Sequence, residues 1–491
     1  MSDSIIKNKA ISGMFHSFIG LFANNGITFI VGMILARLLE PSDYGLLGMV
    51  TVFIAVSGIF VDSGMTTALI REKDVTNEEY STVFYYNLAV SLVVYILLFL
   101  IAGMVSRFFN EPLLVPIIRV VGLGIIVGAF GNIQRTRLTK ELNFKLQTKI
   151  DIISAVLSSI VGIYLAFIEK GVWALVIMGL FRSIIVSFLL MLSNRWTPLL
   201  VFDTRAFKRF FNFGYKMLIT GLLATLYHNV YNMIIGKTYS ADVLGYYTKS
   251  KSLKDMVSMS VLGTVSKVGY PLLSSLQDDK ERFSNGFKKI IRHVSYLTFP
   301  IFFGMMAVSE PLITLLFGQK WIPMIPFFRV LCLSAIVFPH SALNLNVLQV
   351  VGRSDLFLKI DVINMAIGAC LISLSMVLNL GINGLLGMIV LLSLIALITN
   401  SYYSEQYIGY STLEQIKDLF VHLLSSLIMG IVVYIFTILL PFHSLINLTI
   451  SIAIGVVVYI ILSLVFKIAE FWSIANITVE MYKRVVNKNV L

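Results

Sequence analysis

Long apolar stretches recur along this sequence, and they constrain the fold more than any other feature. A helix needs about 20 mostly apolar residues to span the roughly 30 Å hydrocarbon layer of a membrane, where it satisfies its own backbone hydrogen bonds. Runs of that length occur fourteen times in the 491 residues. They cover about residues 10–38, 45–70, 81–107, 112–134, 150–168, 172–193, 213–238, 250–275, 288–316, 323–349, 357–380, 384–401, 415–440 and 444–467. The sequence therefore predicts an all-α polytopic membrane protein with about 14 transmembrane helices.

Composition excludes several functional classes. Apolar residues make up 57% of the chain and charged residues 13%, against about 45–50% and about 25% in soluble domains. The connections leave no room for a folded soluble domain, and no phosphate-binding loop motif occurs, so ATP-driven pumping by this chain alone is excluded. The two cysteines, Cys332 and Cys370, lie in apolar runs, and the six histidines lack metal-ligand spacing. We therefore expect no cofactor and no metal site.

The basic residues predict the orientation in the membrane. The N-terminus lacks the pattern of a cleaved signal peptide, so the first helix is expected to be retained. With the N-terminus inside, the connections and tails on that side carry 26 Lys and Arg residues, and those on the other side carry 8. This asymmetry places both termini in the cytoplasm. It also accounts for most of the net charge of +12 without a nucleic-acid partner.

Two stretches of the first six helices recur in the next six. Residues 32–47 align with 232–247, so that Gly45 meets Gly245, and residues 115–121 align with 325–331, so that Arg119 meets Arg329. Six is an even number, so the two blocks enter the membrane in the same direction and form a parallel repeat. We expect an N-lobe (1–193, helices 1–6), an amphipathic cytoplasmic linker (194–212), a C-lobe (213–402, helices 7–12), and a final helix pair with a basic cytoplasmic tail (403–491). An ordinary basic inner loop fits the linker nearly as well.

Several short motifs carry a resemblance to a known family. They are LLEPSDYG at 38–45, VDSGMTTALIR at 61–71, YSADVLGYY at 239–247, VGYPLLSSLQDD at 268–279, LFGQKWIPMIPFFRVL at 316–331 and LQVVGRSD at 348–355. Their combination resembles the polysaccharide flippases of the multidrug, oligosaccharidyl-lipid and polysaccharide exporter superfamily. It is most similar to the O-antigen, colanic-acid and teichuronic-acid translocase branch.

The resemblance implies a fold and an activity. Two six-helix lobes would form a V-shaped secondary transporter that works by alternating access in the bacterial inner membrane. It would be no enzyme. The substrate would be an oligosaccharide on a polyprenyl diphosphate, turned from the cytoplasmic to the outer leaflet for O-antigen, capsule or exopolysaccharide synthesis. Such flippases are commonly thought to use an H⁺ or Na⁺ gradient, and a polysaccharide polymerase and glycosyltransferases are candidate partners.

Four cations inside the predicted helices are candidate ligands for the diphosphate, because a charge at that depth is unfavourable unless it is paired or wet. Arg182 lies about ten residues from each end of its helix and is the main candidate. Arg119 and Arg329 lie near the outer ends of equivalent helices, where snorkelling is the alternative. Lys267 lies in the eighth helix. The planar fork of Arg suits phosphate oxygens.

The remaining candidates are polar residues in the first two helices of each lobe. Asp62 could carry a coupling ion, pair with a cation, or bond backbone groups at a helix break near Ser63 and Gly64. A set of Asn and His residues in the first helix of each lobe could bind sugar hydroxyls or form hydrogen bonds between helices. Its members are Asn24, Asn25, His228, Asn229 and Asn232.

Two other functional classes stay open. A cation-coupled multidrug exporter of the same superfamily is one alternative, although the first helix lacks the ion-binding aspartate that such exporters often carry. A polymerase or a scaffold of polysaccharide synthesis is the other. The connections, however, contain no large outer loop and no paired acids.

Overall fold

The computed structural model describes residues 20, 23–194, 196–277, 279–439 and 444–476. Within these residues the chain is helical and contains no strand. The first helix is described over Ala23–Leu38. The others are α2 (Pro41–Asp62), α3 (Met65–Arg71), α4 (Asn77–Phe109), α5 (Leu114–Lys140), α6 (Phe144–Phe167), α7 (Val172–Ser193), α8 (Thr204–Thr238), α9 (Ala241–Leu276), α10 (Lys280–Ala307), α11 (Ser309–Phe317), the 3₁₀ helix η1 (Gln319–Met324), α12 (Ile325–Val350), α13 (Ser354–Val377), α14 (Gly381–Ile408), α15 (Thr412–Leu439) and α16 (Ser444–Val465).

Twelve helices in the described part of the chain are long and apolar enough to cross a membrane. This confirms an all-α, multi-pass membrane protein. The first helix is too short over its described residues to be counted, and α9 is too polar along its length. The predicted number of fourteen therefore stays a prediction.

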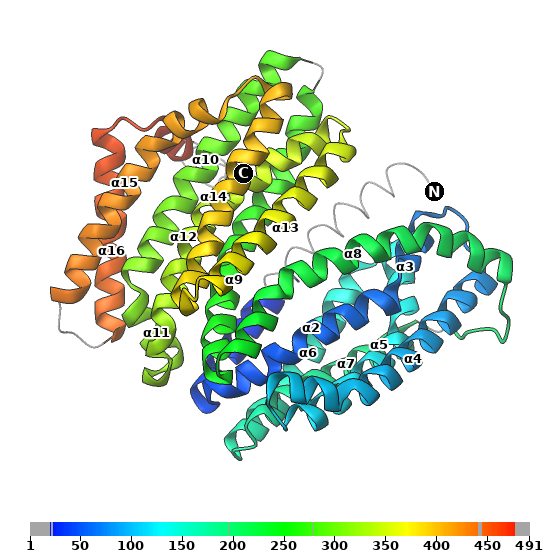
Figure 1. Ribbon diagram of the computed structural model, residues 1–491. Coiled ribbons are helices and arrows are strands. Elements are labelled where there is room, and N and C mark those ends of the chain that lie inside the picture. The colour runs from blue at the N-terminus through cyan, green and yellow to red at the C-terminus, as the bar shows by residue number, and fades with distance from the viewer. Residues whose placement is uncertain (1–19, 21–22, 195, 278, 440–443, 477–491) are drawn as a thin grey trace, which may run out of the picture. The chain divides into compact units, whose positions relative to one another are not determined.

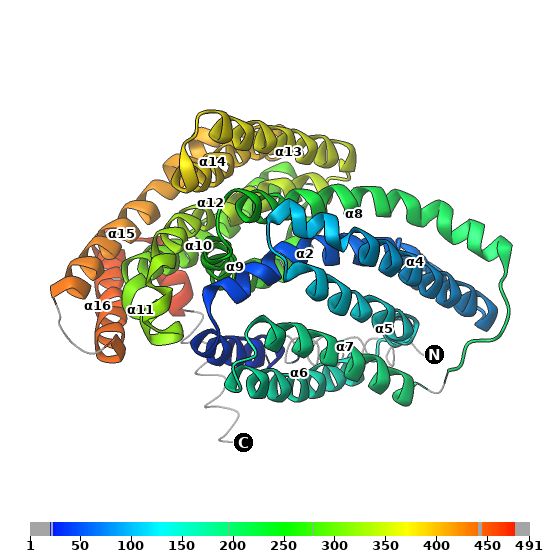
Figure 2. The ribbon, with the colours of Figure 1, turned by 60° about the horizontal axis from the view of Figure 1, so that its bottom comes forward.

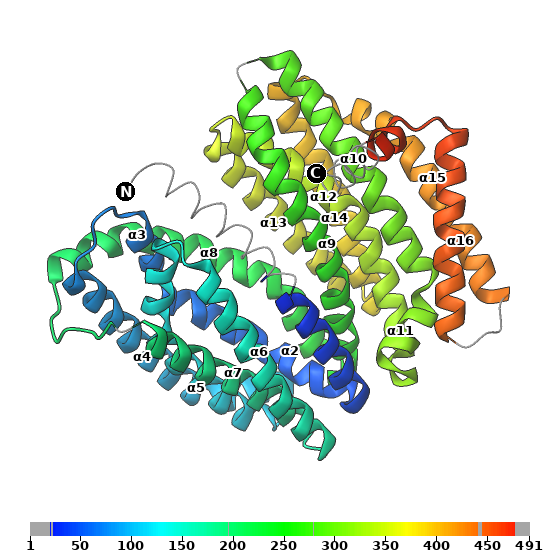
Figure 3. The ribbon, with the colours of Figure 1, turned by 180° about the vertical axis from the view of Figure 1, so that it is seen from behind.

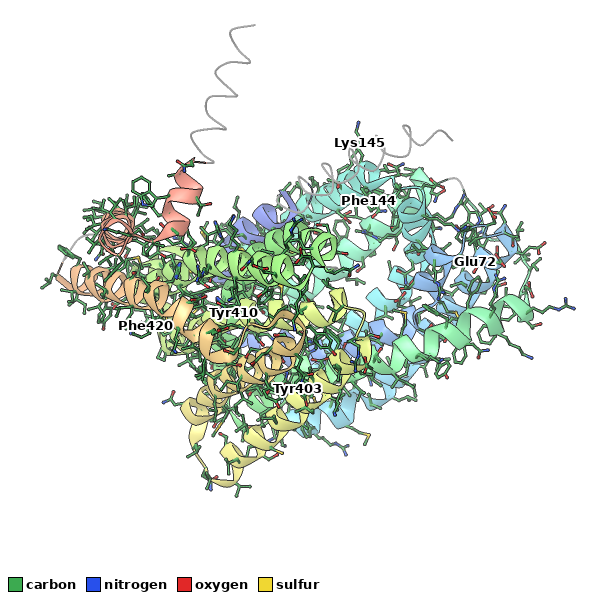
Figure 4. The ribbon with its side chains drawn as sticks, turned by 90° about the horizontal axis from the view of Figure 1, so that it is seen from above. Glu72, Phe144, Lys145, Tyr403, Tyr410 and Phe420 are labelled. Carbon is green, nitrogen blue, oxygen red and sulfur yellow. The ribbon has the colours of Figure 1, made fainter. Side chains whose placement is uncertain are left out.

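Local sequence signals explain where the helices begin and end. A capping box between Thr76 and Glu79 starts α4 four residues before the apolar run at 81. Asp203 accepts hydrogen bonds from the backbone of the next turn and starts α8 inside the predicted linker. The rest of the linker is hydrogen-bonded to α4. The backbone N–H groups of Leu199 and Asp203 donate to side-chain hydroxyls at the start of that helix. Lys145, at the start of α6, projects away from the helices (Figure 4).

The chain divides into two compact units, residues 1–248 and 249–491. In the first unit α5 packs on α4 and α7, α6 lies beside α7, and α2 contacts α8 (Figures 1 and 2). Thus α8, assigned by sequence to the second lobe, shares a compact unit with the first six helices. The helix α9 begins in the first unit and continues into the second. The predicted division into lobes stays a prediction.

The second unit is built around α12 and α10. The helix α12 packs on α14 and α10, and α13 packs on α14 (Figure 1). The last helix pair, α15 and α16, lies beside α10 and α11 (Figure 3). Its contact with α10 buries Tyr296, Met429 and Tyr459.

The chain that follows α16 folds back on α15. The His422 ring donates to the Glu470 carboxylate at 3.1 Å, and both side chains are buried. Burial alone would raise the pKa of Glu470, but the hydrogen bonds from His422 and from the backbone, together with the nearby positive charge of Arg292, hold that pKa below its usual value. This hydrogen bond therefore joins the end of the described chain to the last helix pair.

Candidate functional site

A cavity of about 760 Å³ lies inside the first unit, within the range of small-molecule sites. Its walls are α2 with α3, α5 and α7. Along the chain, α4 connects the α2–α3 segment to α5, and α6 connects α5 to α7. Both connecting helices run in the opposite direction, so α2, α5 and α7 point in the same direction. Glycines in each wall leave room where a side chain would fill the space: Gly58 in α2, Gly124 and Gly128 in α5, and Gly179 in α7.

The cavity changes from apolar to polar along all three walls. The earlier lining residues of each helix are apolar, with Leu47 in α2, Val121 in α5 and Leu175 in α7. The later ones are polar, with Asp62 in α2 and Ser183 in α7. In α5 the polar stretch comprises Asn132, Arg135, Thr136 and Thr139. Because the three helices are parallel, the polar residues share one end, and the cavity suits a molecule with a polar head and an apolar part.

Arg135 is the cation of the polar end. Its guanidinium forms two hydrogen bonds with Asp151 of α6, from Nη2 to Oδ1 at 2.6 Å and from Nη1 to Oδ2 at 3.3 Å. Roughly a third of each side chain stays accessible. The ion pair uses both Nη atoms of the guanidinium and holds Arg135 at the cavity wall. Sequence reasoning missed this residue, since Arg135 was counted among the cations of an inner connection.

A break between α2 and α3 places Asp62 at the same end. Ser63 and Gly64 adopt left-handed backbone conformations, with φ of 40° and 70°. Gly214 of α8 approaches so closely that a Cβ on it would lie 2.2 Å from the Ser63 carbonyl oxygen. This is the break that the sequence offered as one explanation for Asp62. Its carboxylate accepts a hydrogen bond from the Thr66 hydroxyl and also lines the cavity.

Two candidates from distant parts of the sequence meet next to the cavity. The Arg182 Nη2 donates to Asn24 Oδ1 at 2.9 Å, which joins α7 to the first helix. The next residue, Ser183, lines the cavity, whereas Arg182 is only partly buried beside it. Asn25 is exposed. The bond to Asn24 is the structural partner that the sequence offered as the alternative to a cavity role for Arg182.

The other predicted cations are not among the residues that line this cavity. Arg119 stacks on the Phe99 ring at 4.0 Å, and its side chain is exposed. Arg329 donates from Nε to the Ser309 hydroxyl at 2.8 Å and lies 5.4 Å from the centre of the Tyr434 ring. Lys267 falls within α9, but its side chain lies outside the described residues.

The polar group in α8 is divided. Asn229 donates to the Thr225 carbonyl of its own helix at 2.8 Å, and His228 is exposed. Asn232 is buried, and its side-chain oxygen has no hydrogen-bond partner among the described residues. The neighbouring Tyr231 stacks on Tyr247 with ring centres 6.4 Å apart. None of these residues lines the cavity.

The fold and the cavity together define a class: polytopic membrane proteins whose helices enclose a site with a polar and an apolar end. Within that class the chain belongs to the family described as "Polysaccharide biosynthesis protein", whose model matches residues 34–326, more than half of the sequence. The family expected from the sequence motifs is thereby confirmed.

Known proteins show how far the similarity extends. The teichuronic acid biosynthesis protein TuaB of Bacillus subtilis is 27% identical over 300 residues, which cover 61% of this chain and 62% of that relative. The lipopolysaccharide biosynthesis protein WzxC of Escherichia coli is 26% identical and covers 73% of each chain. The solved structure of the lipid II flippase MurJ, in an inward closed conformation, has a TM-score of 0.74 at 16% identity and covers 92% of this chain and 98% of that chain. The transporter fold expected from the sequence is therefore confirmed.

Proposed function

We propose that this protein flips polyprenyl-diphosphate-linked oligosaccharide repeat units from the cytoplasmic to the outer leaflet of the bacterial inner membrane. The carrying observation is the cavity, whose polar end holds Arg135 with hydroxyl and amide groups and whose other end is apolar. A diphosphate needs a bidentate cation, a sugar needs hydrogen-bonding partners, and the prenyl chain needs apolar surface. Membership of a polysaccharide biosynthesis family supports the same substrate class.

The charge asymmetry supports the direction of transport. With both termini in the cytoplasm, the polar end of the cavity faces the cytoplasm, where α5 ends near the basic residues Arg137 and Lys140. A substrate assembled inside would therefore meet the polar end first. Alternating access then moves the bound head group across, as expected for a secondary transporter rather than an enzyme.

A drug exporter is less well supported. The first helix carries no acid, and the residues that line the cavity include a cation, Arg135, as well as one carboxylate, Asp62. This lining is not the purely acidic one that would attract cationic compounds. Transport of the lipid-linked oligosaccharide into the outer leaflet of reconstituted vesicles, measured by its access to an external glycosidase, tests the proposal. Export of cationic dyes without oligosaccharide flipping would contradict it.

Arg182 provides a test in cells. We expect Arg182→Ala to abolish surface polysaccharide at unchanged protein level, with lipid-linked repeat units accumulating inside, because Arg182 directly precedes Ser183, which lines the cavity. The matched control is Asn24→Ala, which removes the hydrogen-bond partner and keeps the charge. Normal polymer from Arg182→Ala would remove this residue from the site. Equal losses from both variants would assign the defect to the helix contact.

Asp62 is proposed as the ion-coupling residue, carrying H⁺ or Na⁺. Its carboxylate lines the cavity at a helix break, where water and ions have access. We expect Asp62→Asn to flip substrate down its own gradient but to lose the acceleration by an imposed pH or Na⁺ gradient. The control is Thr66→Val, which removes the hydroxyl bonded to Asp62. A gradient response as large as that of the unmodified protein would exclude coupling at this residue.

A further inference from the structure

The linker between α7 and α8 presents a run of apolar side chains to its surroundings. Residues 199–202 are Leu, Leu, Val and Phe, and they follow no helical path. Leu200 is 93% exposed, and each of its three companions is between 44% and 48% exposed. Four consecutive exposed apolar side chains are unfavourable in water, whereas the boundary of a membrane accepts them.

Two hydrogen bonds fix the depth of this run. The Leu199 N–H donates to Ser81 Oγ at 2.9 Å. The Asp203 N–H donates to Thr82 Oγ1, also at 2.9 Å. Ser81 begins the long apolar run of α4, so residues 199–203 lie at the level where α4 enters the hydrocarbon layer. The predicted orientation assigns this level to the inner leaflet.

The first turns of α8 place cations next to the apolar run. Arg205 and Lys208 are exposed and lie three residues apart, so their side chains are neighbours on the helix surface. Phe210, in contrast, faces the core and is buried. A third cation of these turns, Arg209, forms an ion pair with Glu79 of α4. Two exposed cations therefore adjoin the exposed apolar side chains.

A row of aromatic rings joins the apolar run to α8. Phe202 packs on Phe207 with ring centres 5.6 Å apart, and Phe207 stacks on Phe211 at 5.5 Å. The Tyr86 ring of α4 contacts both rings of α8, with centres 5.4 and 6.3 Å apart. These contacts hold the linker and the first turns of α8 together as one surface. Aromatic rings are also the side chains that favour the membrane boundary.

From this surface we propose that residues 199–202, with Arg205 and Lys208, bind an anionic phospholipid of the inner leaflet. The two cations bind the lipid phosphate, and the apolar side chains contact the acyl chains. The bound lipid anchors the start of the helix whose Gly214 packs against the break between α2 and α3. This inference goes beyond the proposed transport activity, because the phospholipid is not the transported substrate.

Lipid selectivity tests the two cations. Purified protein in detergent is titrated with phosphatidylglycerol or with phosphatidylcholine of the same acyl chains, and native mass spectrometry counts the bound lipid. We expect phosphatidylglycerol to bind preferentially. The double variant Arg205→Gln/Lys208→Gln should bind it about thirtyfold more weakly, because each cation near a lipid phosphate contributes about fivefold.

The matched control is Lys145→Gln, which removes an exposed cation at the start of α6 (Figure 4). This variant should bind phosphatidylglycerol as tightly as the unmodified protein does. Equal binding of the two lipids by the unmodified protein would overturn the proposal. An equal loss in Lys145→Gln and in the double variant would do the same, because the linker would then be an ordinary basic loop.

Competition and an apolar variant identify the occupant. Leu200→Ser should weaken phosphatidylglycerol binding about tenfold through lost apolar contact, and the exposed position of Leu200 leaves the fold intact. Inorganic phosphate should displace the lipid poorly, since it lacks acyl chains. Displacement by inorganic phosphate at the concentrations at which the lipid binds would show a site for a free anion. Tighter binding of polyprenyl diphosphate would assign the surface to the transported substrate, and either result would overturn the proposal.

Fluorescence quenching measures the depth of the apolar run without any transport. Leu200→Cys, in a chain whose Cys332 and Cys370 are serine, is labelled with a fluorophore and reconstituted in vesicles. We expect nitroxide-labelled lipids to quench this label strongly and aqueous iodide to quench it weakly, whereas a label on Lys145→Cys should show the reverse. Quenching of the Leu200→Cys label mainly by iodide would place the run in water, where a soluble protein partner would have to cover it, and would overturn the lipid site.

Discussion

The helices α5 and α12, which the predicted repeat aligns with each other, place their polar residues in different surroundings. The last turns of α5 present Asn132, Arg135 and Thr139 to a cavity. The corresponding part of α12 directs its polar side chains into closed hydrogen bonds. Asn344 and Gln415 exchange two amide hydrogen bonds at 2.9 and 3.1 Å, and Ser404 donates to the same Asn344 oxygen at 2.6 Å.

If the predicted repeat holds, the two aligned helices differ in what their polar residues do. At the repeat spacing of 210 residues Arg135 corresponds to Leu345, so the cation of the cavity has no counterpart in α12. The amide pair instead joins α12 to α15, whose first turn follows the fully buried Tyr410 (Figure 4). In α5 the polar groups line a cavity, and in α12 they join the helix to α15 of the last helix pair.

Within the comparison of α5 and α12, the largest effect is expected from removing the cation of α5. Arg135→Ala should lower flipping by about ten- to a hundredfold, because a hydrogen bond to a charged group contributes about 1.5–3 kcal/mol. The rate at which reconstituted vesicles flip lipid-linked oligosaccharide measures this loss. Arg135→Lys should restore part of the activity, since a point charge lacks the bidentate fork.

Two matched variants separate binding from structure. Lys145→Ala removes an exposed cation five residues beyond the end of α5 and should leave flipping unchanged. Asp151→Asn removes the partner's charge but leaves an amide oxygen that can accept a hydrogen bond from Arg135. If Asp151→Asn reduced flipping as much as Arg135→Ala, the ion pair would be structural, and the contrast between α5 and α12 would lose its functional meaning.

A smaller effect, on stability, is expected in α12. Asn344→Leu leaves the Gln415 amide and the Ser404 hydroxyl without their partner, which should lower the free energy of unfolding in detergent by about 1–3 kcal/mol. Flipping per folded molecule should stay unchanged. The double variant with Gln415→Leu should lose less than the sum of the two single variants, because the residues are directly coupled. Additive losses would show that the amide pair does not act as a unit.

Sequence reasoning predicted the helices better than the site, and particular residues show why. The apolar run at 172–193 coincides with α7, because the membrane requires a continuous helix there. The same rule misjudged Arg135, since apolar length ended the fourth helix at 134 whereas α5 continues to Lys140. Depth along a helix singled out Arg182, but nothing local could reveal that Asn24, 158 residues away, accepts its hydrogen bond. The lining of a cavity depends on such contacts between distant residues, whereas a membrane-spanning helix depends on local composition.

The smallest effects are expected where the two helices are alike. Arg119 of α5 and Arg329 of α12 occupy equivalent positions, and both guanidinium groups lie over aromatic rings, Phe99 and Tyr434. An exposed cation–π contact contributes about 0.5–1 kcal/mol, so Arg119→Lys should shift thermal unfolding only slightly and leave flipping intact. Arg329→Lys also loses the donor to Ser309 and should be the more destabilising of the two. A strong loss of flipping in both variants, at normal stability, would show that the repeat kept these cations for the substrate and that α5 and α12 share more function than their inner ends suggest.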